Sequence, residues 1–200
     1  MAFTYFFRDM QTLEVAADNF VPAVMGRKYV HIWDAGCAMG PEPYSLAIIL
    51  AEKMGTFAFR NVRIDATDID ESNLFKDIIT NGIYPEEQLR RIPGEIFSKY
   101  FEKDVEPGYF RVISKIRKCL SFQKHDLLSF KPIGENYSMI VCKNVLLHFK
   151  EAERIEIINM FYKALTGRGY LVLEQTQKLP DELTGLFEQI NTNVQVFRKI

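Results

Sequence analysis

Short apolar runs alternate with amphipathic stretches along most of the chain. The apolar runs lie at residues 29–33, 62–70, 137–142, 170–174 and 194–200. Their length and continuity are typical of strands buried in a parallel sheet. Between them, apolar residues recur every three or four positions, which predicts helices at residues 3–25, 43–54, 73–80, 151–165 and 181–190. Alternating strands and helices predict an α/β fold with a mostly parallel sheet and helices on both faces.

Residues 83–120 interrupt this alternation with prolines, short helical stretches and two β runs at 108–113 and 119–122. We expect these β runs to be antiparallel and the segment to form an inserted subdomain or lid within a single domain spanning residues 1–200. At finer scale, Gly55 is a plausible helix stop and Ser72 a candidate cap for the helix at 73–80.

Composition narrows the classes of protein. The chain has 200 residues, 48% of them hydrophobic, and a formal net charge of −1, which favours a folded domain without a nucleic-acid footprint. No apolar run approaches the roughly 20 residues needed to cross a bilayer, and no signal peptide is visible. The cysteines are three and widely spaced, which suits a reduced, cytoplasmic protein. Neither they nor the three histidines show ligand spacing, so we expect no metal.

The glycine-rich stretch after the first strand is the first candidate site. Asp34, Gly36 and Gly40 precede a helix that opens on proline, an arrangement that presents backbone N–H groups and a helix N-terminus to a ligand. No Lys-Ser/Thr pair follows, so the stretch is not a phosphate-binding P-loop, and Ala38 breaks the dinucleotide pattern. The spacing resembles the first motif of S-adenosylmethionine (SAM)-dependent methyltransferases. An ordinary strand–helix turn is the alternative.

Polar residues recur at the predicted carboxyl ends of the strands, where open α/β sheets bind ligands. An acid at the end of the second strand, Asp68, suits the two hydroxyls of a ribose, and Asp126 could accept from an adenine amine. Glu42 would offset the charge of a cationic amino tail. Each acid alone could equally be a solvated turn residue, but their strand-by-strand spacing favours a ligand.

Six motifs in order resemble the chemotaxis-receptor methyltransferases of the CheR type, over nearly the whole chain. They start at Thr4, Ile32, Ala66, Gly82, Asp126 and Cys142, and read TYFFRD, IWDAGCAMGPEPYS, ATDID, GIYPEE (with YF at 100–101), DLL and CKNVLLHF. The resemblance implies a class I, Rossmann-like methyltransferase fold and SAM as the cofactor. It implies that SAM is held by residues matching Thr4, Arg8, Glu42, Asp68, Asp126, Leu127, Asn144 and Val145. It also implies methyl transfer to a glutamate side chain of a receptor.

The chain departs from the family pattern on the substrate side. It begins at the first motif, without the helical domain that precedes it in the family. His148 stands where the family carries its active-site tyrosine, Pro41 replaces the first acid of a Glu-Glu pair, and Ala2 replaces an asparagine. Residues 174–177 also differ from the usual pattern.

Two residues are candidates for the reaction itself. Arg8 could orient the acceptor carboxylate by a bidentate contact. His148 could act as a base for an acceptor that carries a proton, or serve only as a hydrogen-bonded replacement for tyrosine.

Three alternatives therefore stay open. One is methylation of a small-molecule acceptor on the same scaffold, and another is a catalytically silent SAM-binding module. An NAD-type oxidoreductase is disfavoured by Ala38 and the placement of Asn144. Nothing in the sequence specifies an oligomeric state.

Overall fold

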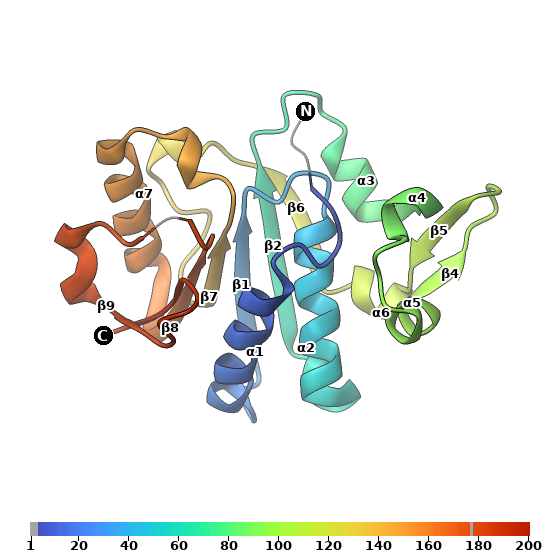
Figure 1. Cartoon of the computed structure of the whole chain (residues 1–200), viewed down its shortest axis with the longest axis horizontal. Helices are drawn as coiled ribbons and strands as arrows, with labels where there is room; N and C mark the ends of the chain where they lie inside the picture. The colour runs from blue at the N-terminus through green and yellow to red at the C-terminus, as the bar shows by residue number, and fades with distance from the viewer. Residues whose placement is uncertain (1–3, 177) are drawn as a thin grey trace.

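Within the described residues, 4–176 and 178–200, the computed structural model forms a seven-stranded sheet with the order β6-β2-β1-β7-β8-β10-β9 and a separate three-stranded sheet, β3-β5-β4 (Figure 1). The large sheet contains β1 (Val30–Ala35), β2 (Val62–Asp68), β6 (Leu120–Lys124), β7 (Tyr137–Cys142), β8 (Leu165–Leu173), β9 (Phe187–Gln189) and β10 (Val196–Lys199). The small sheet contains β3 (Ile83–Pro85), β4 (Phe101–Lys103) and β5 (Tyr109–Val112). The helices are α1 (Met10–Val24), α2 (Pro41–Phe59), α3 (Phe75–Asn81), α4 (Glu86–Leu89), α5 (Gly94–Tyr100), α6 (Ser114–Arg117) and α7 (Glu151–Ala164), with 3-10 turns η1 (Leu127–Ser129), η2 (Leu146–His148) and η3 (Asp181–Leu186).

The predicted α/β architecture is confirmed. Strands β6, β2, β1, β7 and β8 run parallel, whereas β10 pairs antiparallel with both β8 and β9. The strand order reverses between β1 and β7, because the chain goes outward from β1 to β6 and then returns to β7 on the other side. The loops that follow β1 and β7 therefore diverge and leave a crevice between them, the usual ligand site of such sheets.

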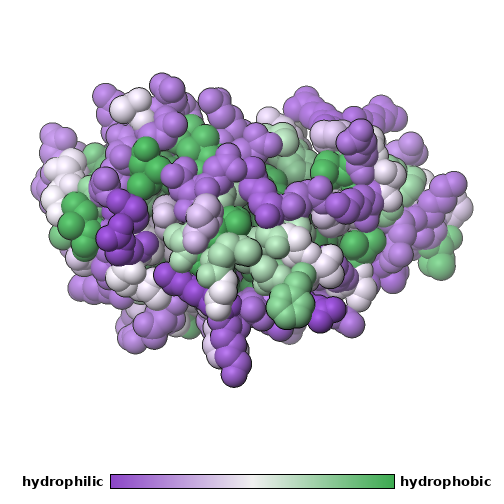
Figure 2. All heavy atoms as spheres, turned by 90° about the horizontal axis from the view of Figure 1, so that it is seen from below, coloured by the Kyte–Doolittle hydropathy of each residue, from purple (hydrophilic) through white to green (hydrophobic). Residues whose placement is uncertain are grey.

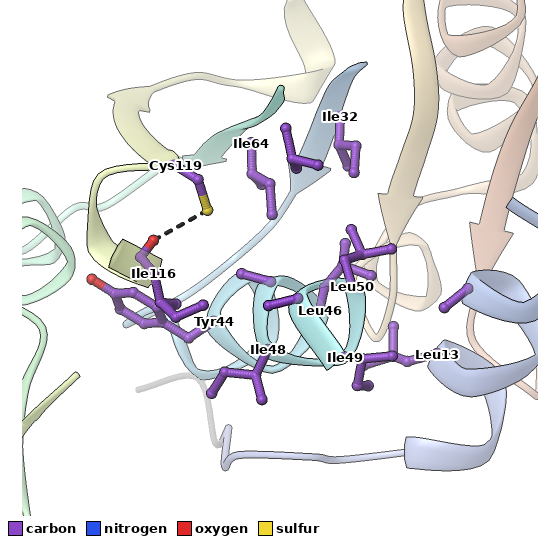
Figure 3. Close-up of a cluster of buried hydrophobic side chains, with 14 of the residues drawn as sticks. Leu13, Ile32, Tyr44, Leu46, Ile48, Ile49, Leu50, Ile64, Ile116 and Cys119 are labelled. Carbon is purple, nitrogen blue, oxygen red and sulfur yellow. Dashed lines mark hydrogen bonds between the residues drawn. The ribbon is translucent and has the colours of Figure 1, made fainter. Parts of the chain in front are cut away.

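Two apolar cores fill the space on either side of the large sheet, because successive residues of a strand point to opposite faces. Ile32 and Ile64 pack with α1 and α2, as the close-up of this core shows (Figure 3). Trp33 and Ile140 belong to the other core, under α7. Both faces of β7 are buried along its whole length, which explains its mostly apolar sequence.

Several local expectations were wrong. Residues 119–122 are not antiparallel to 108–113: Leu120–Lys124 forms β6, the parallel edge of the large sheet, so the inserted segment ends before it. Residues 181–190 form η3 and the short strand β9 instead of a helix, because β10 offers an antiparallel partner. The expected stop at Gly55, by contrast, is confirmed: its backbone is non-helical, with φ 72° and ψ 171°, and a second helical stretch follows it to Phe59 within the range of α2.

Ser72 does not cap α3. The N-cap residue is Leu74, and the Asp70 carboxylate, from the preceding turn, accepts from the backbone N–H of Leu74 and of Phe75, both at 3.2 Å. The Ser72 hydroxyl instead donates to Asp70 at 2.9 Å.

Figure 2 shows the face at which α1 and α2 end, opposite the carboxyl ends of β1 and β2. Hydrophilic residues predominate there around a small group of apolar ones.

No helix of the described part of the chain has the length and hydropathy needed to span a bilayer. All three cysteines are buried free thiols.

Candidate functional site

A pocket of about 590 Å³ opens at the carboxyl ends of the central strands, at the point where the strand order reverses. This volume lies within the range typical of small-molecule sites. Ten of the eleven residues predicted to form the site line it: Thr4, Arg8, Gly36, Glu42, Asp68, Asp126, Leu127, Asn144, Val145 and His148. Residues from five separate stretches of the chain therefore meet in one cavity. Ala2 lies outside the described residues.

The glycine loop is held rigidly at the floor of the pocket. The N–H groups of Gly36 and Cys37 donate to the Thr67 carbonyl at 2.7 and 3.0 Å, which anchors the loop to the end of β2. Gly36 has φ +93°, and a Cβ there would lie 2.2 Å from Cγ2 of Val145. Only glycine lets the loops after β1 and β7 approach this closely.

Gly40 is required for a different close approach. Its φ is +99°, and a Cβ there would lie 2.7 Å from Cγ1 of Ile79 in α3. Beside it, the Tyr84 hydroxyl donates to the Met39 carbonyl at 2.8 Å. The inserted segment thus supports the start of α2 from outside.

Asp68 is fixed before any ligand binds. Its Oδ2 accepts from the Ala38 N–H at 2.9 Å, and its Oδ1 accepts from the Asp70 N–H at 3.2 Å. A carboxylate has about four acceptor sites, so capacity remains for two hydroxyls of a ligand. The Asp68 side chain is therefore held by the glycine loop, with its remaining acceptor sites available for the ribose hydroxyls expected from the sequence.

The segment after β6 forms one wall of the pocket. Asp126 caps η1, because its Oδ1 accepts from the Leu128 N–H at 2.9 Å, and Leu127 contributes a buried apolar surface. Between β6 and this cap, His125 lines the pocket with its ring 5.6 Å from that of Trp33. Burial lowers the pKa of His125, which favours the neutral imidazole.

Glu42 and Lys143 form a buried ion pair at another wall. Their Oε2 and Nζ atoms are 3.1 Å apart, and the lysine side chain is fully buried. Burial raises the pKa of Glu42, while the neighbouring Lys143 ammonium opposes this shift. The Lys143 ammonium thus favours the charged form of Glu42, which is the form that an ammonium group of a ligand would bind.

Arg8 reaches the pocket from the N-terminal segment, residues 4–9. This segment is anchored by Phe6, whose ring packs against those of Tyr84 and Phe101 at 5.0 and 5.4 Å. The Phe7 N–H also donates to the Ser45 hydroxyl of α2 at 2.8 Å. The half-buried Arg8 side chain is therefore presented by a fixed backbone.

The segment after β7 closes the site. Asn144 has a left-handed backbone, φ 59°, and its N–H donates to Oε2 of the buried Glu174 at 3.0 Å. His148, in η2, lines the pocket and is exposed. A general base needs such access to the acceptor.

Asp34 is the one predicted residue that does not line the pocket. It belongs to β1, is 0% exposed, and neither carboxylate oxygen has a hydrogen-bond partner among the described residues. Burial, with Glu42 nearby, raises the pKa of Asp34 well above its usual value. Because Asp34 belongs to β1 and not to the loop after it, its side chain lies inside the protein. The prediction that Asp34 contacts the ligand directly is therefore corrected.

The sequence interpretation missed several lining residues. Lys143 stands beside Asn144 at the same strand end, and that position could have identified it. The others are revealed by the fold: Cys37, Ala38, Thr67, Ile69, His125, Leu128, Leu147 and Phe149.

The described lining suits SAM. SAM has an amino-acid tail, a ribose and an adenine. The pocket offers a close backbone approach at Gly36, the acids Glu42, Asp68 and Asp126, and apolar side chains between them. The described residues contain no group of three or more histidine, cysteine or acidic side chains placed to hold a metal ion.

Comparison with known proteins identifies a family and a fold. The profile of the family described as "CheR methyltransferase, SAM binding domain" matches residues 2–196. A chemotaxis protein methyltransferase of Borreliella burgdorferi is 30% identical over 88% of this chain and 64% of its own length. One from Vibrio anguillarum is 30% identical over 98% of this chain and 72% of its own length.

Solved structures agree on the fold. Magnesium protoporphyrin IX methyltransferase (ChlM) from Synechocystis PCC 6803, with bound SAM, aligns with a TM-score of 0.52 and 17% identity over 95% of this chain and 78% of that one. A TehB-like SAM-dependent methyltransferase from Corynebacterium glutamicum aligns with a TM-score of 0.50 and 15% identity over 92% and 88%. The Rossmann-like class I fold predicted from the sequence is confirmed.

Proposed function

The chain belongs to the CheR methyltransferase, SAM-binding domain family, and from this we propose that it transfers a methyl group from SAM to a glutamate side chain of a chemotaxis receptor. The observation that carries the proposal is the convergence of ten predicted residues on one pocket at the reversal of strand order. The chain spans between about two thirds and three quarters of the length of the curated relatives it matches, 64% and 72% for the two described above.

We assign the lining residues to parts of the cofactor. Glu42 receives the ammonium, Asp68 accepts from the ribose hydroxyls, and Asp126 with Leu127 contacts the adenine. Thr4, Gly36, Asn144 and Val145 complete the contact surface. When bound, SAM supplies a methyl group already activated by its sulfonium.

The protein's own contribution to the reaction is then positioning and exclusion of water. Arg8 would hold the acceptor carboxylate by a bidentate contact, which lysine could not reproduce. A glutamate acceptor is ionised at neutral pH, so no general base is needed. His148 would matter as a base only for an acceptor that carries a proton.

A transfer assay with methyl-labelled SAM tests this function. The acceptors are a receptor signalling fragment, the same fragment with its methyl-accepting glutamates changed to alanine, and a small-molecule extract. We expect label on the first fragment only, released by mild base as a methyl ester should be. Label on small molecules would favour the alternative acceptor, and calorimetric SAM binding without transfer to any acceptor would favour a silent module. Absence of SAM binding would exclude the whole proposal.

The compartment stays a prediction. Three buried free thiols suit the reduced cytoplasm that we propose, where the signalling part of a receptor would be accessible.

A further inference from the structure

Lys143 is a buried cation at the centre of the site. It follows β7 directly, and its side chain is 0% exposed. Its Nζ lies 3.1 Å from Glu42 Oε2, 3.3 Å from the Arg8 carbonyl oxygen and 3.8 Å from Asp9 Oδ2. One ammonium thus touches both the acid assigned to the cofactor and the backbone of the arginine assigned to the acceptor.

The backbone that Lys143 holds is strained. Phe7 and Asp9 have φ values of 59° and 51°, in the left-handed region that side chains other than glycine disfavour. Arg8 lies between them, and Lys143 donates to its carbonyl oxygen. Strained backbone persists only where its surroundings fix it, so this hydrogen bond helps determine where the Arg8 side chain is presented.

The electrostatic surroundings give Lys143 a second task. Buried acids approach it from three elements: Asp34 in β1, Glu42 in α2 and Glu174 after β8. Burial raises the pKa of each of these carboxyl groups, and the Lys143 charge acts in the opposite direction on all three. Glu42 is the one among them that lines the pocket.

We propose that Lys143 is a positioning residue that joins the two halves of the site, pairing with Glu42 on the cofactor side while holding the Arg8 backbone for the acceptor. The proposal rests on the proposed function. Lys143 acts through Glu42 and Arg8, because its ammonium is engaged by the Glu42 carboxylate and the Arg8 carbonyl oxygen. Binding of the cofactor and orientation of the acceptor are then set by a single side chain.

The test compares Lys143→Met, Lys143→Arg and wild type, with Lys76→Met as a matched control at an exposed lysine of α3. SAM affinity is measured by calorimetry from pH 6 to 8, and kcat at saturating SAM. For Lys143→Met we expect SAM affinity to fall by about tenfold or more. We also expect a loss of kcat that saturating SAM does not restore, since Arg8 is released as well. Lys143→Arg should recover most of the SAM affinity and most of kcat. Lys76→Met should match wild type in both quantities.

The pH profile separates this role from a merely structural one. Without the Lys143 charge the pKa of Glu42 rises further, so a larger fraction is protonated at pH 6 and the decline of SAM affinity shifts to higher pH. Asp34 and Glu174 lose the same opposing charge, so their pKa values rise in the variant too, but neither of them lines the pocket, whereas Glu42 does. The other charged or titratable groups near this cluster are present in both variant and wild type: Arg8, Asp9, Cys37, Asp68, Cys142 and His148.

Removing one partner of a buried ion pair can prevent folding. In that case Glu42→Gln, in which Lys143 keeps Asp9, Asp34 and Glu174 as acidic neighbours, is compared with Glu42→Gln/Lys143→Met, which removes both charges of the pair. We expect the double variant to have a kcat at least about fivefold below that of Glu42→Gln, because the Arg8 backbone is no longer held.

Equal kcat in that pair would overturn the inference. So would a folded Lys143→Met with wild-type affinity, kcat and pH profile. If the wild-type protein binds no SAM, both the proposed function and this inference are wrong. If the wild-type protein binds SAM and the Lys143 variants behave as it does, only this inference is wrong.

Discussion

At the scale of single residues, Asp68 and Asp34 show that similar acids near one site have opposite environments. Asp68 is half-buried, lines the pocket and accepts two backbone hydrogen bonds. Asp34 is fully buried without a partner among the described residues. The first carboxylate is held ready for a ligand, and the second is an unsatisfied group inside the protein.

Replacing Asp68 tests the cofactor assignment. We expect Asp68→Ala to weaken SAM binding by about 2–3 kcal/mol, on the order of 30–150-fold, because two charge-assisted hydrogen bonds are lost. Calorimetric titration measures the change. Glu71→Ala, at an exposed acid of the same loop, is the control and should bind as wild type does. An unchanged affinity in Asp68→Ala would remove this residue from the site.

Asp34 makes a pH-dependent prediction. Because burial raises its pKa in the folded state, the folded protein keeps a proton that the unfolded chain releases near pH 4. Stability is therefore lost as pH rises above that value. We expect Asp34→Asn, which stays neutral, to be more stable than wild type at pH 8 by about 1–3 kcal/mol, with a smaller difference at pH 5.

Urea unfolding without SAM at both pH values measures this difference. Glu135→Gln, at an exposed acid, should change neither value. SAM affinity of Asp34→Asn should stay near that of wild type, since Asp34 does not line the pocket. A variant that is no more stable than wild type at pH 8 would contradict the prediction.

At the scale of elements, the N-terminal segment depends on one apolar anchor. Phe6 is 2% exposed and packs among rings of α2 and the small sheet. Residues 4–9 form no regular helix or strand, so side-chain packing and a few hydrogen bonds to α2 and Lys143 hold them in place.

We expect Phe6→Ala to lower the free energy of unfolding by about 3–5 kcal/mol, because it opens a cavity in this packing. It should also weaken SAM binding, since the anchor of Arg8 is lost. Urea unfolding and calorimetry measure the two effects. Phe57→Ala is the control, because the Phe57 side chain is 83% exposed. A loss of stability comparable to that of the control would show that the segment is held by other contacts.

At the scale of the whole molecule, the order of strands creates the site. Because β7 returns beside β1, Val145 meets Gly36 although the two residues are far apart in sequence. The small sheet β3-β5-β4 then supports the glycine loop and the N-terminal segment through Tyr84 and Phe101. The inserted segment thus stabilises the site from outside.

The sequence by itself determined the class of fold, the central strands and most of the pocket lining, because the buried strand positions are mostly apolar and most of the predicted lining residues follow the carboxyl ends of the strands. Tertiary structure decided the rest. Leu120–Lys124 became a parallel edge strand and Phe187–Gln189 a strand because partners distant in sequence were available. Likewise, Asp34 turned inward and Lys143 came between Glu42 and Arg8. Such outcomes depend on which side of a strand a residue faces and on what packs against it, and local pattern does not specify either.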